Sequence, residues 1–167
     1  LPLHSENYEI VNGITHVRYK PLFNDMVGKV LVMTRAINTL SSDEDVRISK
    51  RLFVSSKRLR GFQSGKIGPI DNGSYIGGNY MASFNAAASL PNFLPAFQNT
   101  DFNVFFDAAN VWGVDYDKSV DDRSTIRSSV VLGLDVNTVI GPLNFSLSQP
   151  ITKASGDKTE TFRFNLG

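Results

Sequence analysis

Residues 79–90 read NYMASFNAAASL, and alternate positions in this stretch differ in chemistry. The odd-numbered positions are mostly small or polar. The even-numbered positions are apolar, and they are Tyr80, Ala82, Phe84, Ala86, Ala88 and Leu90. Because successive side chains of a β-strand point to opposite faces, this alternation predicts a strand with one apolar and one polar face.

The same alternation recurs on both sides of this stretch. It predicts further strands at residues 26–38, 102–112, 124–138, 143–148 and 162–166, with a less regular strand at 8–19. Segments rich in Pro, Gly, Asn and Asp separate these runs and are typical of turns. The chain is therefore predicted to be all-β, with about seven antiparallel strands.

The predicted connections alternate in length. Short connections at one rim and long polar loops at the other are typical of outer-membrane β-barrels. A connection as long as 39–78 is unusual in a compact domain and is normally functional. The predicted short connections are 21–25, 139–141 and a longer turn at 90–101, and the long ones are 39–78, 113–123 and 152–159.

Composition excludes several classes of protein. Hydrophobic residues make up 41% of the chain, and no run reaches the roughly 18 apolar residues that a membrane-spanning helix needs. The formal net charge of +1 gives no overall field that would attract nucleic acid. The absence of Cys excludes disulfides and thiolate chemistry.

A soluble β-sandwich also alternates, so the content of the polar faces separates it from a barrel. These faces hold Ser, Asn and Gly with isolated charges, which favours a hydrated lumen. Leu132, Leu134, Phe145, Leu147 and Phe162 are predicted to face lipid, and Arg127, Asp135 and Arg163 to face the lumen. Aromatic residues near strand ends are candidates for interfacial girdles. They are Tyr19, Phe23, Tyr80, Phe93, Phe97, Trp112 and Tyr116.

Short motifs follow one another in order along the chain from residue 60 onward. The long loop carries Arg60-Gly61-Phe62-Gln63. The later motifs are Ile67-Gly68-Pro69, Ile76-Gly77-Gly78-Asn79, Phe105-Phe106-Asp107-Ala108-Ala109-Asn110-Val111-Trp112, Ile140-Gly141-Pro142-Leu143, Ser148-Gln149-Pro150 and Phe162-Arg163-Phe164-Asn165-Leu166-Gly167. This series resembles the BamA surface-antigen family over essentially the whole chain. The resemblance implies an antiparallel transmembrane β-barrel, of which residues 1–167 would form the last seven of about sixteen strands, an even number as bacterial barrels have.

The resemblance also implies roles for single residues. The extracellular loop 39–78 would fold into the lumen, where Arg60 would pair with Asp107 on the wall beside Phe105. Gly61 would adopt a positive φ or allow close approach, and Phe62 would fill space. The alternative is that Arg60 is one of several solvated cations, which include Arg47, Lys50, Arg51, Lys57 and Arg58.

The chain departs from the family pattern at three places. Ala87 stands where relatives usually carry a Glu, so Arg60 would have one wall carboxylate instead of two. Val54-Ser55-Ser56-Lys57 replaces the usual Gly-Gly pair before the Arg, and a final aromatic is missing after Gly167. We therefore expect a weaker anchor for the loop.

The function that the resemblance implies is insertion and folding of β-barrel proteins in the outer membrane of a Gram-negative bacterium. No enzymatic reaction and no cofactor are expected. The expected partners are unfolded outer-membrane proteins, periplasmic lipoproteins of the assembly complex and outer-membrane lipid, without nucleic acid. An incoming strand would add by β-augmentation at a lateral seam. The seam strand would consist of Thr161, Phe162, Arg163, Phe164, Asn165, Leu166 and Gly167.

Other functions remain open from the sequence. A two-partner secretion barrel or a related translocation barrel would share the Arg-Gly-Phe loop, and a passive porin or a soluble β-sandwich binding module is a more distant alternative. The first residues lack the basic and apolar regions of a signal peptide. Seven strands would leave two unpaired edges in hydrocarbon, so further N-terminal strands are expected upstream of this chain. The resemblance implies periplasmic transport repeats there as well.

The spacing of the residues does not favour a metal site, a catalytic nucleophile or a phosphate-binding loop. Asp115, Asp117, Asp121 and Asp122 lack the Gly and terminal Glu of a calcium-binding loop, so a solvated outer loop is expected there. His4 and His16 have no Cys partners for zinc. Neither a nucleophile elbow nor a phosphate-binding loop has its required residues around 61–66.

Overall fold

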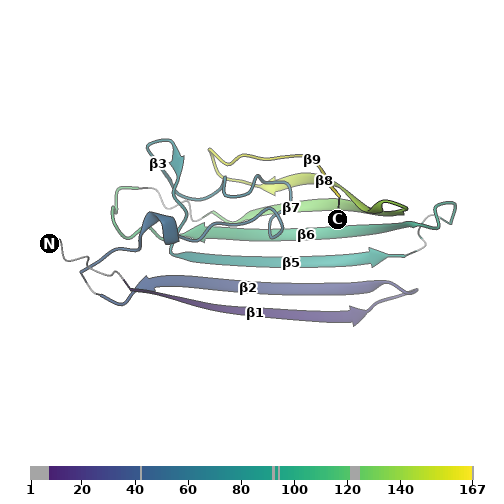
Figure 1. Ribbon diagram of the computed structural model, residues 1–167, viewed down its shortest axis with the longest axis horizontal. Coiled ribbons are helices and arrows are strands. Elements are labelled where there is room, and N and C mark those ends of the chain that lie inside the picture. The colour runs from purple at the N-terminus through teal and green to yellow at the C-terminus, as the bar shows by residue number, and fades with distance from the viewer. Residues whose placement is uncertain (1–7, 42, 92, 94, 121–124, 167) are drawn as a thin grey trace.

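A computed structural model describes residues 8–41, 43–91, 93, 95–120 and 125–166. Seven strands form one antiparallel sheet in the order β1-β2-β5-β6-β7-β8-β9 (Figure 1). The edge strands β1 and β9 do not pair with each other within the described residues. The strands are β1 (Glu9–Pro21), β2 (Val27–Thr39), β5 (Tyr80–Leu90), β6 (Thr100–Trp112), β7 (Arg127–Thr138), β8 (Gly141–Thr152) and β9 (Phe162–Leu166).

The strand prediction is confirmed in number and order, and β8 shows the largest difference in length. Alternation predicted a strand over 143–148, whereas β8 runs on to Thr152 and includes Pro150. A proline removes one ladder hydrogen bond, so it is normally excluded from the middle of a sheet. Here the pairing of β7 with β8 shifts register between Ser128 and Ser129, opposite Pro150, and the irregularity accommodates the ring.

The connections lie as the sequence predicted, with short turns at one end of the sheet and long loops at the other (Figure 1). The segment between β2 and β5 contains a short 3-10 helix, η1 (Ile48–Lys50), and a small hairpin of β3 (Ile70–Asp71) and β4 (Ser74–Tyr75). Among the described residues, no helix is long and apolar enough to cross a membrane.

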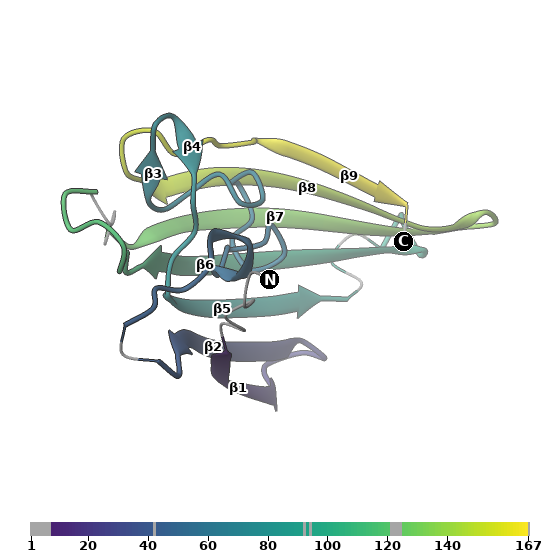
Figure 2. The ribbon, with the colours of Figure 1, turned by 60° about the vertical axis from the view of Figure 1, so that its left-hand side comes forward.

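The two faces of the sheet differ, and the pairing register assigns residues to each. Leu31, Asn85, Asp107 and Ser129 form one row of paired residues. Their face is covered by the long connection (Figure 2), and we call it the loop face. The opposite face, which no described segment covers, is called the bare face. It carries the even-numbered residues of β1, β2, β5, β6, β7 and β9, which alternate with those of the loop face.

The predicted side-chain directions are confirmed by this register. Leu132, Leu147 and Phe162 are paired in one row on the bare face and are more than half exposed. Leu134 pairs with Phe145 on the same face. Arg127, Asp135 and Arg163 lie on the loop face.

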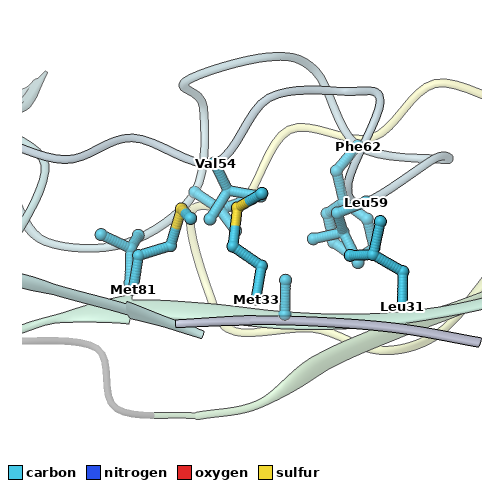
Figure 3. Close-up of a cluster of buried hydrophobic side chains, with 9 residues drawn as sticks. Leu31, Met33, Val54, Leu59, Phe62 and Met81 are labelled. Atoms are coloured by element: carbon cyan, nitrogen blue, oxygen red, sulfur yellow. The ribbon is translucent and has the colours of Figure 1, made fainter. Parts of the chain in front are cut away.

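The buried core lies between the long connection and the loop face of the sheet. Figure 3 shows Val54, Leu59 and Phe62 of the connection pointing toward Leu31, Met33 and Met81 of the strands. Each fully buried side chain of this size contributes roughly 1.5–3 kcal/mol. Packing therefore holds the connection against the loop face of the sheet.

Two of the predicted girdle aromatics do not lie on the bare face. Tyr19 pairs with Lys29, whose ammonium lies 5.4 Å from the ring centroid, so Tyr19 belongs to the loop face. Tyr116 lies in the loop after β6, with its hydroxyl on Asp71. The other five lie near the two ends of the strands, where Tyr80 and Trp112 form a ring pair with centroids 5.9 Å apart.

Candidate functional site

The candidate site is built around Asp107, a carboxylate on the loop face of β6. Asp107 is completely buried, and its register neighbours are Asn85 on β5 and Ser129 on β7. A buried carboxylate is costly unless hydrogen bonds and an opposite charge compensate for lost hydration. The environment of Asp107 must therefore supply donors.

Arg60 supplies the charge, as the motif predicted. Its Nη1 atom lies 2.9 Å from both carboxylate oxygens of Asp107. The Arg60 backbone N–H donates to Oδ2 at 3.1 Å. A single guanidinium nitrogen contacts both oxygens, so the contact is not the two-nitrogen fork that Arg often forms with a carboxylate. The guanidinium carbon also lies 4.0 Å from the centre of the Phe105 ring, so the predicted wall partner makes a cation–π contact.

Asn85 is a member of the site that the sequence analysis did not identify. Its Nδ2 donates to Asp107 Oδ1 at 2.8 Å and to the Arg58 carbonyl at 2.7 Å. The amide thus links the wall to the loop two residues before Arg60. Ala87, at the position where a Glu was expected, makes no such link. The sequence did contain a sign of this role, because the alternation in residues 79–90 places Asn85 on the polar face of its strand.

Gly61 and Phe62 take the positions that the motif implied. Gly61 has φ of 90°, and a Cβ there would lie 3.0 Å from the Ser148 Cβ. Any side chain would therefore be strained and crowded. Phe62 is 1% exposed in the core. Ser129 donates from its hydroxyl to the Arg60 carbonyl, which closes the contact between loop and wall.

The motif also pairs, through its backbone, with the segment that leads into β9. Gln63 donates its N–H to the Lys158 carbonyl at 2.9 Å, and Glu160 donates its N–H to the Gly61 carbonyl at 2.9 Å. Phe62 and Thr159 form an isolated antiparallel bridge between these two hydrogen bonds. The side chain of Gln63 is exposed, so only its backbone serves the contact.

The predicted seam residues lie mainly on β9. Phe162, Phe164 and Leu166 are exposed on the bare face, and Arg163 donates to the Ser56 hydroxyl of the loop. Thr161 precedes β9, and its carbonyl accepts the Ser148 N–H at 2.7 Å. Asn165 pairs with Asn144, and Gly167 lies outside the described residues.

A second ion pair on the loop face was not predicted. Arg127 donates from Nε and Nη2 to the two oxygens of Asp157, at 2.9 and 3.1 Å. Both side chains are almost fully buried. The Asp157 carboxylate also accepts the Ala154 N–H at 2.7 Å. This two-nitrogen pair fixes the loop between β8 and β9 against β7.

A third ion pair corrects two expectations from the sequence. Arg51 and Asp115 were expected to be solvated, yet the Arg51 side chain is fully buried and contacts Asp115. Asp115 also accepts hydrogen bonds of 2.9 Å from the Val46 N–H and from Asn79 Nδ2. Partial burial raises the pKa of Asp115, but these bonds and the guanidinium outweigh burial and leave the pKa below its ordinary value.

Nearby loop groups serve local structure. Tyr116 donates to Asp71 at 2.7 Å, and this bond, together with burial, raises the pKa of Tyr116 to about 12. Asp117 accepts the hydroxyl and N–H of Ser119, which lowers the pKa of Asp117. No cluster of three or more metal-binding side chains occurs in the described part of the chain. Asp121, Asp122 and His4 lie outside it.

The chain is similar to curated and solved members of one group of proteins. It is 28% identical over 146 residues to the outer membrane protein assembly factor BamA of Neorickettsia risticii, covering 85% of this chain and 20% of that relative. A crystal structure of BamA from Haemophilus ducreyi lacking POTRA domains 1-3 superposes with a TM-score of 0.80 at 27% identity, covering 98% of this chain and 35% of that one. The chain thus spans about a third or less of the length of these relatives.

The family assignment rests on the match to a family model together with the fold. The seven-stranded antiparallel sheet matches part of a BamA β-barrel. A model of the Omp85 superfamily domain matches residues 10–167, so the chain belongs to the Omp85 superfamily.

Proposed function

We propose that the protein inserts and folds β-barrel proteins in the outer membrane of a Gram-negative bacterium. Membership of the Omp85 superfamily supports this proposal, as does the similarity to a protein named as an outer membrane protein assembly factor. Its partners would be unfolded outer-membrane proteins and the lipoproteins of an assembly complex on the periplasmic side. The reaction would be non-covalent.

The composition of the bare face supports a position in lipid. Its exposed residues include Leu132, Leu147 and Phe162, and the strands present no Asp or Glu on this face in the described residues. A sheet can remain in hydrocarbon only if its edges are paired, because unpaired backbone groups cost several kcal/mol there. The sheet described here would therefore be part of a closed barrel.

The observation that carries the proposed mechanism is the position of β9 in the sheet. β9 pairs with β8 from Leu143↔Leu166 to Leu147↔Phe162, and its other edge has no strand partner in the described residues. Such an edge presents backbone donors and acceptors to which an incoming strand can add. We place the lateral seam at this edge.

The position of the long loop argues against a passive porin. The loop packs Val54, Leu59 and Phe62 onto the loop face, which would line the lumen of a closed barrel. The Arg60–Asp107 pair and the backbone pairing with 158–160 hold the loop there. In this proposal the loop supports the inner wall beside the seam.

A cysteine-trapping experiment tests the seam. The chain contains no Cys, so introduced thiols in it are unique. In the full-length protein, Asn165→Cys places a thiol on β9. Ser146→Cys serves as the matched control, because Ser146 is the β8 partner of Arg163 and lies on the same face one strand further in. A stalled β-barrel substrate with cysteines along its last strand is then expressed, and disulfide adducts are counted.

The seam predicts adducts at position 165 that require the substrate and are absent at position 146. Adducts at 146 with none at 165 would instead favour passage through the lumen, as in a secretion barrel. Equal yields at both positions would contradict the seam assignment.

A further inference from the structure

Charged side chains are distributed unequally between the two faces of the sheet. On the loop face lie Glu9, Lys29, Arg35, Asp101, Asp107, Arg127, Asp135 and Arg163. In the described strands, the bare face carries only two Lys or Arg side chains, Arg18 and Lys20, and no Asp or Glu. The two cations therefore have no carboxylate partner on their own face within the described residues.

The register fixes the position of these two residues. Arg18 lies in one row with Val30, Ala86 and Phe106. Lys20 lies in the next row, with Gly28, Ala88 and Val104. Lys29 points to the loop face between these rows, where its ammonium lies over the Tyr19 ring. Both cations are exposed.

The cations lie close to the end of the sheet that carries the short turns. β1 ends at Pro21, one residue after Lys20 and three after Arg18. At about 3.3 Å per residue, both lie within roughly 10 Å of the strand end. A cation on the lipid face of a barrel is costly at the middle of the bilayer, and the cost falls close to zero near the interface. The position is therefore compatible with headgroup depth.

An apolar groove adjoins the two cations on the bare face. It has a volume of about 510 Å³, and Arg18, Lys20, Leu22, Val30, Val104 and Phe106 are among its lining residues. Small residues form its floor where Gly28, Ala86 and Ala88 meet. Larger side chains on both sides and small ones between them leave room for a hydrocarbon chain.

From this pairing of charge and groove we infer a binding site for an anionic phospholipid of the leaflet on the short-turn side. Arg18 and Lys20 bind the headgroup phosphate, and one acyl chain lies in the groove over Ala86 and Ala88. Arg and Lys recognise phosphate oxygens through charge-assisted hydrogen bonds. The inference rests on the membrane placement in the proposed function, but it requires no seam and no substrate.

The test uses the full-length protein reconstituted in bilayers of phosphatidylcholine with a minor fraction of phosphatidylglycerol. Lipid retained after gentle delipidation is counted by native mass spectrometry. The test variant is the double substitution Arg18→Gln with Lys20→Gln. Its control is Arg35→Gln, which removes a cation from the loop face of β2, outside the groove lining. A second variant, Ala86→Leu with Ala88→Leu, fills the groove without changing charge.

The wild type and Arg35→Gln are expected to retain phosphatidylglycerol in preference to phosphatidylcholine. The double Gln variant should lose about 30-fold of that preference, since each basic residue near an anionic surface contributes roughly fivefold. The double Leu variant should retain less of both lipids.

An unchanged preference in the double Gln variant would overturn the site. It would mean that another group neutralises the cations, such as a carboxylate from a strand on the free side of β1. Unchanged retention in the double Leu variant would overturn the groove assignment. Substrate adducts at β9 are scored in the same preparations, so failure of the lipid site and failure of the assembly function are separate results.

Discussion

Replacement of Arg60 by Ala is expected to destabilise the protein by about 2–3 kcal/mol. A hydrogen bond to a charged group contributes roughly 1.5–3 kcal/mol, and an accessible cation–π contact about 0.5–1. The guanidinium that makes both contacts is 30% exposed, which places the expected loss in the lower part of that sum. Asp107 stays buried in the variant and keeps only Asn85 and the backbone N–H of residue 60 as donors.

The measurement is urea unfolding of the full-length protein in detergent micelles, followed by the mobility difference between folded and unfolded barrel. Arg58→Ala is the matched control, because Arg58 lies in the same loop and its side chain makes no ion pair with any residue that the structure describes. It is expected to change the free energy of unfolding by less than about 0.5 kcal/mol. Asp107→Asn completes a double-mutant cycle with Arg60→Ala, and a coupling of about 1–2 kcal/mol is expected for groups in direct contact.

Two results would refute the anchor. Losses that add within roughly 0.3 kcal/mol in the cycle would show that the two side chains act independently. An equal effect of Arg58→Ala and Arg60→Ala would show that the loop responds to its total charge and not to this contact.

Further predictions concern the loops and the membrane placement. Gly61→Ala should destabilise the fold by about 1–3 kcal/mol through its positive φ and close packing, measured by the same unfolding assay. Asp157→Asn should cost about 3 kcal/mol by leaving the buried Arg127 without its charge partner, with exposed Asp117→Asn as control. Because the pKa of Asp115 is lowered on folding, its contribution is present above the unfolded pKa of about 3.9 and is lost as pH falls through the folded value. Asp115→Asn should therefore flatten the acid limb of the stability curve. The isolated chain should partition into detergent, and a detergent-free monomer with cooperative unfolding would contradict the membrane placement.

Alternation allowed the strands and the direction of their side chains to be predicted. Shifting one strand by a single residue would move its apolar side chains to the polar face. Once the apolar residues of neighbouring strands are identified, they must therefore lie in the same rows, as Leu132 and Leu147 do. Tyr19 was a girdle candidate from its place near a strand end, which does not determine the face, and the pairing with Lys29 puts it on the loop face. Alternation also underestimated the length of β8. The strand continues through Pro150 because a register shift accommodates the proline, and only the pairing with β7 reveals that shift.

The Arg60–Asp107 contact was predicted from the motif series, whereas the other two ion pairs were not. Arg51 and Asp115 are 64 residues apart and Arg127 and Asp157 are 30 apart, and no local pattern joins them. Arg51 resembles its solvated neighbours in the sequence. Only packing of the loop against the sheet gives it a buried position and makes a partner necessary.

The backbone pairing between the motif and residues 158–160 has a consequence for the order of folding. Phe62 and Thr159 meet although more than half of the chain separates them, and closing so long a loop costs chain entropy before the contact can form. During synthesis the motif emerges well before its partner. The contact can form only after residues 158–160 have emerged, so their arrival sets the earliest time at which this part of the loop reaches its final position.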